Sequence, residues 1–212
     1  SLHAQGYAWG LWPETKLIAV KAPVFSFAKL TQVDISLGPE MKSTGEVMGV
    51  DMTYPGALYK AFIAAGFSLP RGGAILATLS DRDKAEALPL LKRLADRGFK
   101  ILATMGTAAY LRVNGVPVTK LNKIDEESPN ILDAVKNGEV QLLVNTITRG
   151  KEPERDGFKI RRASVEHNIP CLTSLDTVKA FLQVLLALDD GKDPSMVIPI
   201  QDFKTIRVEQ AI

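Results

Sequence analysis

From residue 72 onward, short apolar runs alternate with segments in which apolar residues recur at helical spacing. The runs at 74–79, 99–104 and 140–144 are mostly apolar, which is typical of strands buried on both faces of a sheet. The spacing indicates helices at 88–98, 107–113, 131–135, 156–168 and 178–188, with shorter extended segments at 116–118 and 170–172. Because strands alternate with helices, the pattern predicts an α/β fold with a parallel sheet covered on both faces.

The first 70 residues differ, because proline and glycine interrupt each short apolar stretch. The expected elements are short strands at 16–21 and 24–27, a loop at 37–46 and a helix from Pro55 to Gly66. Pro23 is expected to separate the two strands. The contrast predicts two units, residues 1–70 and 71–212, and the tail from Met196 is typical of an edge strand or an extended arm.

Composition and charge narrow the class of protein. The chain has 212 residues, enough for one or two domains, and a formal net charge of +2, whereas nucleic-acid binders usually carry a marked basic excess. It has no apolar run of the roughly 18–20 residues that a membrane span needs, and its N-terminal residues do not resemble a signal peptide. Cys171 is the only cysteine, which excludes a disulfide framework and favours a reducing, cytoplasmic compartment. We therefore expect neither a nucleic-acid nor a membrane partner.

Residues that can bind an anion follow the predicted strands, where ligands of parallel sheets are usually held. The candidates are Thr78 and Lys84, then Thr104, Gly106 and Thr107, then Lys123, and finally Asn145, Thr146, Thr148 and Arg149. A helix that begins after Thr104 would add free backbone N–H groups and the positive end of its dipole. No acidic residue is expected among these groups, although Asp81 and Asp83 are near in sequence. The set is suited to a phosphate or a carboxylate.

Each candidate also has an ordinary structural interpretation. Threonines and glycines after strands often form turns and helix caps, and an isolated lysine is more often a solvated surface residue. The sequence has neither a phosphate loop that ends in Gly-Lys-Ser/Thr nor a GxGxxG motif, so a mononucleotide or a small acid is favoured over a dinucleotide. His167 is expected near a helix end, Cys171 in the core, and Arg161 and Arg162 in ion pairs or near a ligand or partner.

Two groups of motifs resemble a known family. The segments Ala22–Phe27 (APVFSF) and Leu37–Gly49 (LGPEMKSTGEVMG) resemble the end of the second ATP-grasp unit in the large chain of carbamoyl-phosphate synthase. The segments Asp156–Arg162 (DGFKIRR) and Pro170–Thr177 (PCLTSLDT) resemble the regulatory domain that follows it in that family. The resemblance extends over nearly the whole chain in the family's order and is closest to bacterial forms.

The resemblance implies a methylglyoxal-synthase-like fold from about residue 71, with a five-stranded parallel sheet and flanking helices, preceded by an α+β remnant of an ATP-grasp domain. It also implies that the residues which bind the effector's phosphate in that family correspond here to Thr78, Lys84, Thr104, Gly106, Thr107, Lys123 and Asn145. It also implies a parent enzyme that makes carbamoyl phosphate from bicarbonate, glutamine-derived ammonia and ATP with Mg or Mn, for pyrimidine and arginine synthesis. The implied partners are a phosphorylated effector such as UMP or IMP, the remainder of the large chain and the glutaminase small subunit.

Two departures from the family bear on catalysis. The metal-binding Glu and Asn of the ATP-grasp unit lie upstream of this chain in the family's order, so we expect no catalytic residue and no cofactor in the chain itself. Methylglyoxal synthases use a His-Asp element where this sequence has Leu79–Asp83, which contains no histidine. The leading hypothesis is therefore an allosteric module. The alternatives are an enzyme of the methylglyoxal-synthase or IMP-cyclohydrolase type, and an oligomerisation or docking module that exposes Phe25, Phe27 and Met41.

Overall fold

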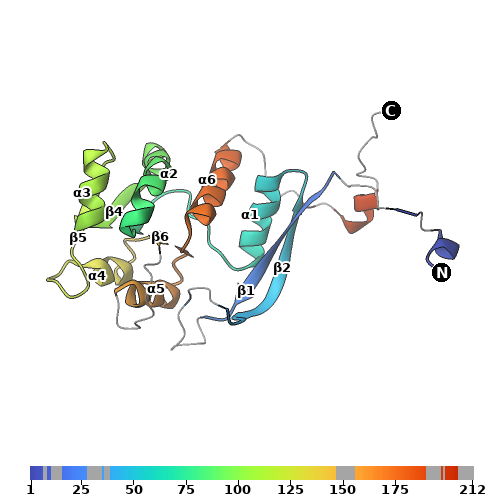
Figure 1. The fold of residues 1–212 in the computed structure, drawn as a ribbon, viewed down its shortest axis with the longest axis horizontal. Coiled ribbons are helices and arrows are strands. Elements are labelled where there is room, and N and C mark those ends of the chain that lie inside the picture. The colour runs from blue at the N-terminus through green and yellow to red at the C-terminus, as the bar shows by residue number, and fades with distance from the viewer. Residues whose placement is uncertain are drawn as a thin grey trace.

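The computed structural model describes residues 1–6, 9–10, 16–27, 35, 39–146, 156–189, 197 and 199–204. The chain first forms a two-stranded ribbon with one helix and then a larger unit built on a five-stranded sheet (Figure 1). Helix α1 (Tyr54–Ala64) of the first part packs beside α6 (Leu175–Asp189) of the second. In the part of the chain that is described, no helix is long and apolar enough to span a bilayer.

The larger sheet is parallel throughout, as the sequence pattern predicts. Its strands are β3 (Ala74–Thr78), β4 (Lys100–Thr104), β5 (Thr119–Leu121), β6 (Leu142–Asn145) and β7 (Cys171–Leu172). They lie in the order β5-β4-β3-β6-β7, so the chain moves outward from β3 to β5 and then returns to the other side of β3. The order therefore reverses between β3 and β6, the position where parallel sheets open a crevice for ligands.

Helices cover both faces of this sheet (Figure 1). Side chains alternate along β3, so that Ile75 and Ala77 face one core while Ala74 and Leu76 face the other. The first core is closed by α2 (Lys84–Asp96), α3 (Met105–Val113) and α6, and the second by α4 (Ile131–Lys136) and α5 (Asp156–Glu166). Both cores are needed because each strand of a parallel sheet is apolar on its two faces.

Two sequence-based expectations about this unit are wrong in detail. The extended segment at 116–118 is not a strand. Val116 is buried in the core beneath α3, and the ladder with β4 begins only at Thr119. Asp81 does not cap the following helix. It begins the short 3-10 helix η2 (Asp81–Asp83), and its carboxylate accepts from Lys84 at 2.6 Å.

The first part contains an antiparallel ribbon that the sequence pattern obscures. Strand β1 (Ile18–Phe25) runs unbroken through Pro23 and pairs with β2 (Ser43–Asp51), so Ser43–Glu46 are strand rather than loop. Pro23 is tolerated because β1 pairs on one side only, and a proline at an unpaired edge removes no ladder bond. The helix predicted from Pro55 is confirmed as α1, whose first turn is capped by the Thr53 side chain.

Gly49 sets how closely α1 approaches β2. A Cβ atom at this position would overlap the backbone oxygen of Ala57 and the backbone nitrogen of Ala61. Gly49→Ala should therefore displace α1 and lower the free energy of unfolding by about 1–3 kcal/mol, as overpacking does elsewhere. Urea unfolding measures the change. Gly45→Ala on the same strand is the matched control, because nothing lies within 4 Å of its Cβ position. Equal losses in both variants would contradict this packing.

The described part of the C-terminal tail is neither an edge strand nor an extended arm. Residues Ile200–Lys204 form the 3-10 helix η3, and a similar short helix, η1 (His3–Gln5), lies near the N-terminus. The prediction for the tail is thus wrong at η3, and the rest of it lies largely outside the described residues.

Candidate functional site

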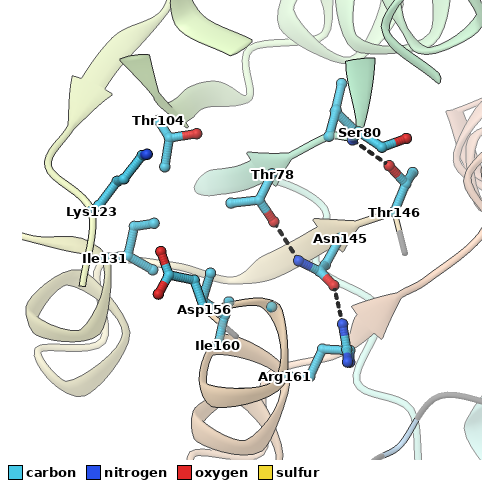
Figure 2. A pocket seen from close by; sticks show the side chains of 12 residues that line it. Thr78, Ser80, Thr104, Lys123, Ile131, Asn145, Thr146, Asp156, Ile160 and Arg161 are labelled. Carbon is cyan, nitrogen blue, oxygen red and sulfur yellow. Dashed lines mark hydrogen bonds between the residues drawn. The ribbon is translucent and has the colours of Figure 1, made fainter. Parts of the chain in front are cut away.

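A pocket of about 160 Å³ opens beyond the carboxyl ends of the central strands (Figure 2). Thr78, Thr104 and Asn145 are the last residues of β3, β4 and β6, and all three line it. Thr78 and Asn145 are register partners on neighbouring strands, so the sheet itself places their side chains together. The pocket therefore occupies the crevice at which the strand order reverses.

A chain of hydrogen bonds crosses the floor of this pocket (Figure 2). Arg161 of α5 donates from Nη1 to Oδ1 of Asn145 at 2.7 Å, and Nδ2 of Asn145 donates to Oγ1 of Thr78 at 2.6 Å. The bond from Arg161 thus fixes which end of the Asn145 amide faces Thr78. Because Thr78 Oγ1 accepts this bond, its own hydrogen is directed elsewhere and can be donated to a ligand.

Arg161 and its neighbour Gly157 are closely packed in this arrangement. Arg161 is 7% exposed, so the positive charge of its guanidinium is largely shielded from water. A Cβ atom at Gly157 would lie 3.1 Å from Nη1 of Arg161, which leaves little space for a larger side chain there. A glycine at this position gives Arg161 the room to reach Asn145.

A second set of hydrogen bonds ties the loop after β3 to the end of β6. The Ser80 backbone N–H donates to Oγ1 of Thr146 at 2.9 Å, and the Thr146 N–H donates to the carbonyl of Thr78 at 3.1 Å. The hydroxyl of Ser80 donates to the Asp83 carboxylate at 2.5 Å. Burial by itself raises the pKa of Asp83, but hydrogen bonds from the Ser80 and Thr146 hydroxyls and the charge of Arg82 outweigh it, so the net pKa shift is downward. Asp83 is therefore ionised at neutral pH and holds this wall of the pocket in place.

The structure brings together part of the residue set expected from the sequence. Thr78, Thr104, Lys123, Asn145 and Thr146 line the pocket, whereas Lys84, Gly106 and Thr107 do not. Lys84 instead donates to the carbonyl of Gly106 at 3.2 Å and pairs with Asp81, and Thr107 is only 2% exposed. Thr148 and Arg149 lie outside the described residues.

Helix α5 supplies the pocket residues that strand ends do not reveal. Asp156, Gly157, Ile160 and Arg161 all line the pocket. The expectation that the site contains no acidic residue is therefore wrong, and Figure 2 shows the carboxylate of Asp156 directed into the pocket. The signal in the sequence was the spacing of these residues, at positions one, two, five and six of the helix, which places them on one face.

The chemistry of the pocket combines hydroxyl donors, an amide, two cations and one carboxylate. This set can bind an anion through charge-assisted hydrogen bonds and can use the carboxylate to accept from donors on the same ligand. Neither His3 nor His167 lines the pocket, and Nδ1 of His167 lies 3.0 Å from the carbonyl of Ala163. In the described ranges, no group of three or more His, Cys, Asp or Glu side chains is arranged to hold a metal ion.

Comparison with known proteins agrees with this architecture at the level of the domain. Residues 86–173, less than half of the chain, match the family model described as the MGS-like domain. A solved structure titled "Crystal structure of ForH" is 19% identical over 64% of this chain and 88% of that chain, with a TM-score of 0.37. The family match and the strand order β5-β4-β3-β6-β7 together identify the larger unit as an MGS-like α/β fold.

Proposed function

We propose that the pocket binds a small phosphate-bearing regulatory ligand. The observation that carries this proposal is the convergence of Thr78, Asn145, Lys123 and Arg161 in one pocket at the strand ends. Phosphate oxygens accept only, and these side chains offer N–H and O–H donors with two positive charges. A site of this kind selects among ligands by their negative charge and by how well their oxygen atoms match the directions of its N–H and O–H donors.

At a finer level, we propose that the chain is the effector-binding region of a carbamoyl-phosphate synthase large chain. The MGS-like match supports the regulatory unit, and the motifs at Ala22–Phe27 and Leu37–Gly49 support an ATP-grasp remnant before it. In this proposal UMP, IMP or a similar metabolite binds at the strand ends and changes ATP-dependent carbamoyl phosphate synthesis elsewhere in the parent enzyme. The ligand must then bind two global states of the enzyme unequally.

Calorimetric titration with UMP tests the binding proposal, with IMP and inorganic pyrophosphate in parallel. Lys123→Met should weaken binding about tenfold, because a hydrogen bond to a charged group contributes roughly 1.5–3 kcal/mol. Lys136→Met is the matched control, since Lys136 is an exposed lysine on α4 that does not line the pocket. Equal affinity in wild type and Lys123→Met, or no binding of any of the three compounds, would contradict the proposal.

A catalytic alternative is favoured by Asp156. A carboxylate and Lys123 in one pocket are groups that can transfer a proton, as a phosphate lyase of the methylglyoxal-synthase type requires. The test is turnover of dihydroxyacetone phosphate by the wild-type chain, lost in Asp156→Asn. Absence of turnover removes this alternative.

A docking alternative is favoured by exposed apolar residues of the first part. Met41 is 88% exposed and Met48 63% exposed, whereas Phe25 and Phe27 are half-buried and stack on each other with centroids 4.8 Å apart. Sedimentation over a range of concentrations tests self-association through this surface. A monomer at every concentration would argue against a homo-oligomer.

A further inference from the structure

Helix α5 connects the pocket to the first part of the chain through two consecutive arginines. Arg161 reaches into the pocket and donates to Asn145, as described above. The next residue, Arg162, donates from Nη1 to the backbone carbonyl of Phe27 at 3.0 Å. These two residues belong to one helix and lie about 100° apart around its axis, so their side chains leave it in different directions.

Both partners of the hydrogen bond between Arg162 and Phe27 make further contacts that restrain them. The Arg162 side chain is 11% exposed and its Nε also pairs with Glu166 one turn later, at 2.9 Å. Phe27 follows the end of β1 by two residues and its ring stacks on that of Phe25, which pairs with Ser43 of β2. The hydrogen bond from Arg162 therefore joins α5 directly to the end of the β1–β2 ribbon.

The first turns of α5 line the pocket, where a ligand would contact them. Asp156, Gly157, Ile160 and Arg161 form one wall of the pocket, so an anion that engages Arg161 restrains the start of the helix. The packing of α1 against α6 joins the same two parts, but no residue of α6 lines the pocket. The α6 contact therefore lacks the direct link to the ligand that α5 has.

We propose that occupation of the pocket is communicated to the β1–β2 ribbon through α5, with Arg162 as the coupling residue. This inference rests on the proposed binding function and adds its route of regulation. The ligand stabilises the position of α5 through Arg161, and Arg162 thereby holds Phe27 and the end of β1. Coupling of this kind is a difference in free energy between ligand-bound and free states and is reciprocal.

Hydrogen exchange of the whole 212-residue chain, with and without saturating UMP, measures this coupling. In wild type, UMP should slow exchange of the β1 and β2 amides by about fivefold, the lower end of typical allosteric coupling. In Arg162→Met the slowing should disappear in the ribbon but remain around Thr78 and Asn145. The affinity of this variant for UMP should fall by no more than the same factor, because coupling is reciprocal.

Arg97→Met is the matched control. Arg97 also donates to a backbone carbonyl, that of Leu185 at 3.1 Å, and pairs with Asp189, but it neither lines the pocket nor bonds to the ribbon. In the Arg97→Met variant, UMP should still slow hydrogen exchange of the β1 and β2 amides. If UMP binds and ribbon exchange is unchanged or faster, the coupling route is overturned while the binding proposal stands. If UMP does not bind, both are overturned.

Discussion

Replacing Arg161 by leucine should weaken UMP binding by about thirtyfold or more. Truncating one member of a buried, hydrogen-bonded charged pair typically costs about 2–5 kcal/mol in binding, and roughly 1.4 kcal/mol corresponds to a tenfold change. Arg161 is the cation of the pocket that is buried, and it also orients the Asn145 amide. Its loss removes a positive charge and releases Asn145, so Thr78 no longer receives a directed hydrogen bond. Calorimetry with UMP gives the change.

Two further variants separate this role from a loss of folding. Arg161→Lys keeps the charge but not the planar guanidinium, so its affinity should lie between those of wild type and Arg161→Leu. Arg112→Leu removes an arginine that donates to the carbonyl of Val118 and does not line the pocket, and its affinity should be unchanged. Thermal unfolding shows whether each variant is folded at the titration temperature. A folded Arg161→Leu variant that binds like wild type would remove Arg161 from the site.

The larger unit was predictable from sequence because each of its signals is local. Runs such as Ala74–Thr78 are apolar at successive positions, as is typical of a strand covered on both faces. Gly98 indicates a helix end in the sequence, and its positive φ of 91° agrees with this. Once the strands are known to be parallel, their carboxyl ends fall at one edge. That is why Thr78, Thr104 and Asn145 could be grouped before their contacts were known.

The features that escaped sequence reasoning depend on pairing or on side-chain direction. The β1–β2 ribbon joins residues such as Val20 and Gly49, which are distant in sequence, and glycines in β2 mask its alternation. Lys84 follows a strand but turns toward Gly106, a direction that no spacing reveals. Asp156 enters the pocket from a helix, where strand ends give no signal, and the sequence left open whether Arg161 forms an ion pair or lies near a ligand or partner.

Phe181→Ala should give the largest loss of stability among these variants, about 3–5 kcal/mol. Phe181 is 0% exposed and projects from α6 into the core shared with α2 and β3. Its removal leaves a cavity that close-packed neighbours fill only in part, and the loss is a large share of the roughly 5–15 kcal/mol that stabilises a typical domain. Urea unfolding followed by circular dichroism gives the value.

Leu186→Ala, at a partly buried position on the same helix, is the control and should lose less stability. If Phe181→Ala lost no more stability than Leu186→Ala, then α6 would pack on the sheet through a different face. The arrangement in which α2, α3 and α6 cover this side of the sheet would then be wrong.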